Sequence, residues 1–582
     1  MPRAETIADS PDARSCGDLL HDWLPWLLTA AVTFILLNQL GSGALFEPDE
    51  GRNAEKAREI LVLNDWVTPH ENFYPVLDKP IFFYWLIAVS YKLFGVSEWT
   101  ARLPSFLAAL GCVVLVYRFA RSHWGRWAAL WSALVLVTSV EFFVLARIVI
   151  FDMPLIFFET VALLAFYEAQ RSENRRRRAA LWLAMYLALA LGTLIKGLVA
   201  LVIPGMVCCL FILLRRRWHV LRRMYLVPGI GIFIGVVLPW YLQADARNPG
   251  YLYYYLWAEH FGRYTTATFD RSEPWYYFIV VALIGFFPWT VLLPWMIKNL
   301  WRRSWDDKTL YLVIWVCVPL LFFSASNSKL PHYILPIFPA VAIMAGATVV
   351  GLCEKSAAKL RIALSLVWVV QTANGLYLLF GSFYPRILAH QIRDPFIGMA
   401  EMLWVYAIGS LLILGYMATR SIHDARVRPS LIYLAQLVGL GVFLVFFTQM
   451  MVSISPDRSA KTTALAALAQ LRTGAQVVFF ETYMSGMPFY LHSERPIWLI
   501  THDNKKRTFL GNYHVIGKRQ DPLTPWGKAI FNLDDFREQW KTRKQPLLVI
   551  VKEKNFDRLV KTVGEALNPV ATIDEYFLVT NR

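Results

Sequence analysis

The chain has 582 residues, of which 57% are hydrophobic, 15% are aromatic and 17% are charged. Soluble domains carry about one quarter charged residues, so this composition excludes a wholly soluble protein and predicts that most of the chain lies in lipid. The formal charge of +16 comes largely from short basic runs between apolar stretches, such as 175–178 and 215–217, which indicates cytoplasmic anchors and excludes a nucleic-acid surface.

The N-terminus and the cysteines predict a retained first span and no structural disulfide. Residues 1–22 are polar and of mixed charge, unlike the basic start of a signal peptide. The small residues 41–44 would permit cleavage, but we expect 23–40 to remain as the first span. No CxxC pair occurs among the six cysteines, most of which lie in or beside apolar stretches.

Thirteen apolar stretches are long enough to cross a bilayer, which takes about 20 helical residues. They predict an all-α membrane bundle with juxtamembrane helices. The predicted spans are 23–40, 103–120, 127–143, 152–170, 179–195, 197–214, 224–243, 275–297, 309–325, 333–353, 362–383, 402–419 and 430–452.

The segment 81–95 decides the sidedness of everything that follows it. It has 15 residues, fewer than a span needs, and is crowded with aromatic side chains. If it lies flat at the interface, the loops on one face carry 23 lysines and arginines, and the opposite face carries 14 over many more residues. If it spans, the arginine-rich loops face outward, against the positive-inside rule. We therefore expect thirteen spans, with the N-terminus inside and the C-terminus outside.

The outer face then holds a first loop at 41–102, a second loop at 244–274 and a C-terminal tail. In the tail, Lys461–Leu471 has a helical pattern. This alternation of patterns predicts a membrane domain at 1–452 and a soluble α/β domain at 453–582. Extended patterns occur at 476–480, 496–500, 547–551 and 573–580.

The chemistry is expected on this outer face. The cytoplasmic loops contain neither a GxxxxGK[ST] nor a GxGxxG motif, so the sequence shows no binding motif for ATP or a nucleotide sugar on that side. An activated group would then be carried across the membrane, and a lipid phosphate is the natural carrier. The first loop begins with Glu47, Asp49, Glu50 and Arg52 within six residues, which indicates a site beside the membrane. The same run also fits a simple helix start.

Further charges stand where outward spans end or inward spans begin. Headgroup anchoring explains each cation singly. Convergence on one anionic ligand explains several together, because lysine and arginine match phosphate oxygens. These charges are Asp78, Lys79, Arg147, Asp152, Lys196 and Lys329.

Two further observations bear on a metal site and on a buried acid. Glu259 and His260, with Arg263 close by, could bind a divalent metal such as zinc together with Asp78. Adjacent residues are poorly spaced metal ligands, however, and a hydrogen-bonded loop histidine is the simpler interpretation. Glu159 lies within the fourth span and either stabilises the bundle or lines a cavity. No cofactor is required by the sequence.

The motifs, in this order and with this shared sidedness, resemble those of GT-C membrane glycosyltransferases. The branch is the one that includes protein O-mannosyltransferases and lipid A 4-amino-4-deoxy-L-arabinose transferases. The runs 322–324 and 329–336 are similar to the aminoarabinose transferase side, and the resemblance covers about residues 23–350. It rests on Glu47-Pro48-Asp49-Glu50, Asp78-Lys79-Pro80, Arg147 with Asp152-Met153-Pro154, and Lys196-Gly197.

The resemblance implies transfer of aminoarabinose from undecaprenyl phosphate to a lipid A phosphate, at the periplasmic face of the bacterial inner membrane. The product is less negative, which implies resistance to cationic peptides such as polymyxin. Asp49 matches the key first-loop acid of the family, Lys79 a residue near the donor phosphate, and Asp152 a second recurrent acid. The expected partners are therefore the lipid-linked donor, lipid A and membrane lipid, with no protein partner.

The remaining roles follow from the charges of the two substrates. A lipid A phosphate is already largely anionic near neutral pH, so a general base contributes little. We expect Asp49 and Glu50 to hold the sugar ammonium and to orient the acceptor. Cations are expected to offset the charge on the departing lipid phosphate. Around the donor we place Arg52, Lys79, Arg147, Lys196, Arg263, Lys329 and Tyr333.

Other interpretations of the sequence stay open. The same fold would serve a protein Ser/Thr or another glycan as acceptor, and the mass of lipid A would discriminate between them. A lipid transporter or flippase belongs to another class, but transporters often show two related halves with broken helices, and the sequence shows no such pairing. A structural scaffold would leave the outer-face charges unexplained.

Overall fold

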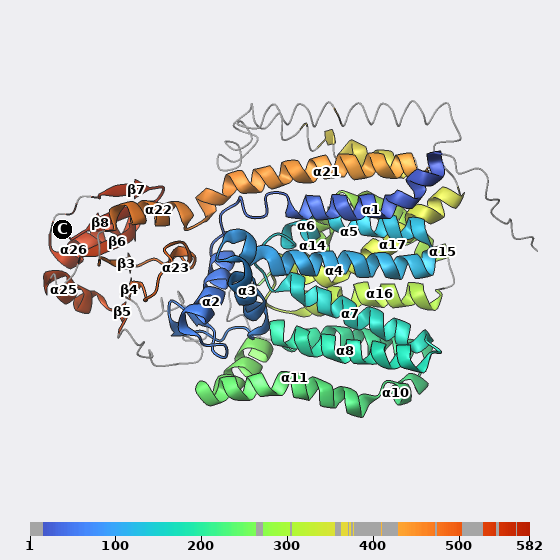
Figure 1. Ribbon diagram of the computed structural model, residues 1–582, viewed down its shortest axis with the longest axis horizontal. Coiled ribbons are helices and arrows are strands. Elements are labelled where there is room, and N and C mark those ends of the chain that lie inside the picture. The colour runs from blue at the N-terminus through green and yellow to red at the C-terminus, as the bar shows by residue number, and fades with distance from the viewer. Residues whose placement is uncertain are drawn as a thin grey trace, which may run out of the picture.

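The computed structural model shows a helical bundle joined to a domain that contains a β-sheet (Figure 1). The bundle helices run side by side, and the sheet lies beyond one end of the bundle. The structure describes residues 16–262, 272–302, 305–355, 362–370, 372–373, 376, 409, 429–471, 474–502, 528–542, 546–565, 567 and 569–581.

Long apolar helices build the bundle, as the apolar stretches predict. Within the described residues, six helices are long and apolar enough to cross a membrane, or seven if one bent pair counts as a span. The chain is therefore a multi-pass membrane protein. The bundle helices are α1 (Cys16–Leu37), α4 (Glu98–Trp124), α5 (Arg126–Thr138), α6 (Val140–Leu145), α7 (Asp152–Arg171), α8 (Arg175–Lys196), α9 (Val199–Arg215), α10 (His219–Arg223), α11 (Leu226–Arg247), α14 (Tyr277–Gly285), α15 (Leu293–Arg302), α16 (Asp307–Ala325), α17 (Phe338–Lys355) and α21 (Pro429–Ile454).

Two stretches predicted as single spans are broken. The stretch 275–297 forms α14, the 3-10 turn η2 (Trp289–Leu292) and α15, and the helical parts are bent by 105°. Pro288, which has no N–H to continue a helix, stands directly before η2. The stretch 127–143 divides at Ser139, whose extended backbone separates α5 from α6. Of the predicted spans 362–383 and 402–419, the structure describes only residues 362–370, 372–373, 376 and 409.

The first loop has structure of its own. It contains α2 (Asp49–Leu63), the hairpin of β1 (His70–Glu71) and β2 (Tyr74–Pro75), and α3 (Phe82–Phe94). With 13 residues, α3 is too short to cross a bilayer, which agrees with the interfacial position expected for 81–95. Both α2 and α3 lie at the end of the bundle that faces the C-terminal domain (Figure 1).

The C-terminal domain is built on a mixed sheet in the order β5-β4-β3-β6-β8-β7. The first four of these strands are parallel, and β8 pairs antiparallel with β6 and β7. The strands are β3 (Gln476–Phe480), β4 (Trp498–Ile500), β5 (Ile530–Phe531), β6 (Leu547–Lys552), β7 (Ala571–Ile573) and β8 (Tyr576–Thr580). The helices are α22 (Lys461–Gln470), α23 (Met487–Tyr490), α25 (Leu533–Thr542) and α26 (Phe556–Val563).

The sequence predicted much of this domain, with one error. The predicted strands 476–480 and 547–551 are confirmed as β3 and β6, and 496–500 contains the shorter β4. The prediction of one strand at 573–580 is wrong. A turn at Asp574, with a φ of 47°, separates β7 from β8 and makes them a hairpin.

The two faces of the sheet have different neighbours, because successive side chains along a strand point to opposite faces. Val477 and Phe479 share a buried core with the first loop, including Tyr84 of α3. Phe480 packs in a separate core with Trp540 of α25. One face of the sheet therefore packs against the first loop in a shared hydrophobic core.

Candidate active site

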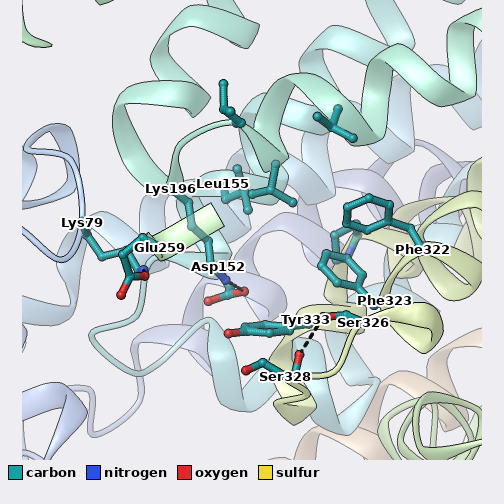
Figure 2. Close-up of a pocket in the computed structure, with 14 residues that line it drawn as sticks. Lys79, Asp152, Leu155, Lys196, Glu259, Phe322, Phe323, Ser326, Ser328 and Tyr333 are labelled. Carbon is teal, nitrogen blue, oxygen red and sulfur yellow. Dashed lines mark hydrogen bonds and ion pairs between the residues drawn. The ribbon is translucent and has the colours of Figure 1, made fainter. Parts of the chain in front are cut away.

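A cavity of about 400 Å³ lies between α7, α8, η3 (Pro331–Ile337) and the second outer loop (Figure 2). The described part of that loop contains α12 (Tyr251–Tyr253) and the π-helical segment η1 (Tyr254–Gly262). Most of the lining is apolar and includes two adjacent phenylalanines of α16. Five side chains predicted from the sequence nevertheless converge on the cavity: Lys79, Asp152, Lys196, Glu259 and Tyr333.

The centre of the site is an ion pair between two neighbouring helices. Asp152 begins α7 and Lys196 ends α8, so the packing of these helices brings them together. Lys196 Nζ lies 2.5 Å from Asp152 Oδ1 and 4.6 Å from the centre of the Tyr333 ring. His332 Nε2 lies 3.7 Å from the second oxygen of Asp152. The Lys196 side chain keeps 13% exposure, so the cation still faces the cavity.

A second ion pair lies on the side of the cavity away from Phe322 (Figure 2). Lys79 Nζ donates to Glu259 Oε2 at 3.1 Å. The Tyr254 hydroxyl lies 3.1 Å from Asp78 Oδ1 and 3.3 Å from Glu259 Oε1. Burial raises the pKa of this hydroxyl, and the two carboxylates raise it further, so Tyr254 stays a donor. The second outer loop is thereby tied to the residues on either side of Lys79.

Asp49 and Arg52 lie on the first turn of α2. The Asp49 side chain is exposed, and Arg52 Nε lies 3.3 Å from Glu71 Oε1. Burial is the largest single influence and lowers the pKa of Arg52, but the nearby acidic groups, Glu71 first and then Asp49 and Asp78, together outweigh it and raise the pKa. Asp78 directly precedes Lys79, which lines the cavity. The Arg52 guanidinium on α2 therefore interacts electrostatically with the residue next to the cavity.

Glu50 and Arg147, which the sequence placed in the site, are held by structural bonds. Glu50 is 2% exposed; it is ion-paired with Arg102 at 2.8 Å and accepts the N–H of Val149 at 2.8 Å. Arg147 donates to the carbonyl of Leu36, near the end of α1, at 2.6 Å. These contacts use the polar groups for folding, so we leave both residues out of the site proposed below.

The remaining residues predicted from the sequence are Lys329, Arg263, His260 and Glu159. Lys329 is buried and donates to the carbonyl of Ser326, which lines the cavity, at 2.5 Å. Arg263 and the side chain of His260 lie outside the described residues. No group of three or more His, Cys, Asp or Glu side chains that could hold a metal occurs in the described parts of the chain. Glu159 is buried in α7, within electrostatic reach of Lys196.

Three side chains near the site were not singled out from the sequence. His332 stands inside the motif at 329–336, which could have drawn attention to it. Tyr254 is one of several tyrosines in the second outer loop, and nothing in the sequence separates it from its neighbours. Glu71 lies beyond the acidic run of 47–50 in the sequence. The fold of the β1–β2 hairpin places it beside Arg52.

The arrangement suits an amphiphilic ligand with an anionic head. Lys79 and Lys196 supply positive charge at two points of the cavity, and Asp152 and Glu259 supply negative charge beside them. Phosphate oxygens and an ammonium group would be recognised by these two kinds of side chain. The apolar lining would accept a hydrocarbon chain.

Residues 78–242, which include both of these lysines, match the family of dolichyl-phosphate-mannose-protein mannosyltransferases. Over 377 residues the chain is 30% identical to the undecaprenyl phosphate-alpha-4-amino-4-deoxy-L-arabinose arabinosyl transferase of Erwinia tasmaniensis, covering 63% of this chain and 68% of that protein. A relative of that name from Pseudomonas fluorescens is 32% identical over 331 residues, which cover 56% of this chain and 59% of the relative. The crystal structure of ArnT from Cupriavidus metallidurans bound to undecaprenyl phosphate is similar with a TM-score of 0.80 and 26% identity, over 96% of this chain and 98% of that one.

Proposed function

The chain belongs to the family of undecaprenyl phosphate aminoarabinose transferases, and from this premise we propose that it transfers 4-amino-4-deoxy-L-arabinose from undecaprenyl phosphate to a phosphate of lipid A. It is a glycosyltransferase with a polyprenyl-phosphate donor. The reaction takes place at the periplasmic face of a bacterial inner membrane, which the chain crosses thirteen times from a cytoplasmic N-terminus. The product carries less negative charge, and this gives resistance to cationic peptides such as polymyxin.

The observation that carries the proposal is the cavity in which Lys79, Asp152 and Lys196 meet. The donor combines an anionic phosphate, a sugar ammonium and a hydrocarbon chain. Cations, carboxylates and an apolar lining are all present in this one cavity, and each matches one part of the donor.

Each residue then has a role in a displacement at the anomeric carbon. A phosphate oxygen of lipid A attacks this carbon as the bond from the sugar to the donor phosphate breaks, with inversion. Lys79 and Arg52 offset the charge that develops on the departing phosphate. Asp152 with Lys196 fixes the sugar, and Asp49 orients the acceptor. The attacking oxygen is already anionic near neutral pH, so it needs no strong base.

The direct test is the mass of lipid A from cells with and without the protein. We expect the mass of one aminoarabinose to be added when the chain is present. Asp49→Asn keeps the shape of the side chain and removes its charge, so the inserted variant should lose most of the transfer. Unchanged lipid A together with a glycosylated protein would favour a protein acceptor. Transfer at the wild-type rate by Asp49→Asn would show that Asp49 only begins α2.

The proposed sidedness has its own test. In a background without the native cysteines, Ser172→Cys should resist an impermeant thiol reagent in intact spheroplasts, whereas Gln520→Cys should react. The reason is the excess of basic residues on the face that holds 171–178. The reverse labelling pattern would place the proposed site on the wrong face of the membrane.

A further inference from the structure

The turn at residues 484–486 of the C-terminal domain packs directly on the start of α2. Glu47 accepts the backbone N–H groups of Ser485 at 2.9 Å and of Gly486 at 2.6 Å. The approach is so close that a Cβ at Gly51 would lie 2.8 Å from the Cα of Gly486. The turn is therefore fixed relative to the first turn of α2.

Ser485 also reaches the Arg52 guanidinium through one buried carboxylate. Its hydroxyl donates to Glu71 Oε1 at 3.0 Å, and Arg52 Nε donates to the same oxygen at 3.3 Å. Lys56 Nζ lies 3.6 Å from the other oxygen of Glu71. The Glu71 side chain is 0% exposed, whereas Arg52 is 26% exposed. Glu71 is thus held from both sides, and it in turn holds the partly exposed arginine.

Glu71 accepts a hydrogen bond from Nε of Arg52, the guanidinium nitrogen nearest the aliphatic part of the side chain. The terminal nitrogens of a guanidinium form much of the planar fork that matches phosphate oxygens. A side chain held at its stem has lost rotamer freedom before the ligand arrives, so binding costs less entropy. Arg52 also interacts electrostatically with Asp49 and Asp78, next to Lys79 of the cavity.

We propose that Glu71 is a positioning residue for Arg52, and that Ser485 extends this positioning from the C-terminal domain. The inference rests on the proposed function, in which Arg52 binds the phosphate of the donor. It gives the C-terminal domain a role in that function. The domain completes the donor-phosphate site without touching the donor.

The test measures binding of undecaprenyl phosphate to the purified full-length protein, as the rise in Tm that the lipid produces. Glu71→Gln keeps the size of the side chain and removes the charge that orients Arg52, so we expect affinity to fall about tenfold. Ser485→Ala removes only the hydroxyl and leaves the Glu71–Arg52 pair, so the variant should fold and lose about threefold. Arg52→Ala with Glu71→Gln should bind no more weakly than Arg52→Ala alone, because both changes act through one contact.

Glu55→Gln is the matched control. Glu55 is also 0% exposed and is paired with Arg58 at 2.7 Å, and Arg58 reaches the carbonyl of Ser493 in the C-terminal domain. This variant disturbs a second contact between α2 and the C-terminal domain without touching Arg52, so the folded protein should bind the lipid as the wild type does. Equal losses in Glu55→Gln and Glu71→Gln, or additive losses with Arg52→Ala, would overturn the inference. A wild-type protein whose Tm does not respond to undecaprenyl phosphate would instead count against the proposed function.

Discussion

At the cavity, Lys196 and Lys79 are each ion-paired with one carboxylate, and they keep 13% and 22% of their side chains exposed. At the start of the first loop, by contrast, Arg102 is 5% exposed and is bound on every side. It donates to both oxygens of Glu50 and to the backbone carbonyls of residues 40, 43 and 44. Both regions are built from the same kinds of side chain, basic residues paired with carboxylates.

The difference separates residues that can bind a ligand from residues that stabilise the fold. An arginine has five N–H donors, and all five of Arg102 have acceptors, so none remains for a substrate. A lysine with one carboxylate partner and an open side has donors left. Charge and position beside the membrane do not distinguish the two cases. The number of bonds already made does.

The largest expected effect is on stability, at the fully bonded pair. Glu50→Gln leaves the Arg102 guanidinium buried without its counter-charge, which should lower the free energy of unfolding by about 3–5 kcal/mol. Thermal unfolding of the purified protein measures this. Lys461→Ala is the control, because it breaks the more exposed pair with Glu98 in the same region and should cost less than about 1 kcal/mol. Equal, small losses of unfolding free energy in both variants would show that the fully bonded Glu50–Arg102 pair does not stabilise the fold more than an exposed pair does.

The next effect is on activity, at the cavity. Lys79→Ala should insert normally and slow transfer about 100-fold, because its charge-assisted bond strengthens as the donor phosphate leaves. Lys92→Ala, on the exposed face of α3, removes only a headgroup anchor worth about 1 kcal/mol and should be mild. Initial rates of transfer to lipid A measure both.

Lys79→Ala also removes an ion-pair partner of the buried Glu259, so the comparison needs a second variant. Lys79→Ala with Glu259→Gln should recover stability without recovering the rate. Equal, small effects at positions 79 and 92 would make Lys79 an anchor and leave the donor phosphate without its leading ligand.

The smallest expected effect concerns pH, at the contact between α2 and the C-terminal domain. Burial raises the pKa of Glu47 to about 7, although the N–H groups of Gly486 and Ser485 and the charge of Arg52 lower it; Glu71 raises it slightly. Because the folded pKa lies above the ordinary value of 4.5, the protonated form is favoured by folding. This stability is fully present below pH 4.5 and is lost as the pH rises through about 7.

Tm measured across that range tests the expectation. The Tm of the wild type should fall as the pH rises, and Glu47→Gln, which stays neutral, should remove that part of the pH dependence. A fall of the same size in Glu47→Gln would assign the pH dependence to another group.

Composition and pattern predicted the bundle, the short α3, and the strands β3 and β6, because these depend on local apolar periodicity. The bend between α14 and α15 and the turn at Asp574 were missed. Each break occupies only one or two residues. A hydrophobicity pattern is averaged over a longer window of residues, so it does not show such a short break.

The class of molecule, most of the apolar helices of the bundle and the charged residues from which a site can be built all follow from composition and local pattern. Which of these charged residues lie together depends on how the helices pack. Asp152 and Lys196 are 44 residues apart and join because α7 and α8 pack side by side. Asp49 and Glu50 are neighbours, yet successive helical residues point about 100° apart. One carboxylate therefore faces solvent on α2, and the other is buried against Arg102.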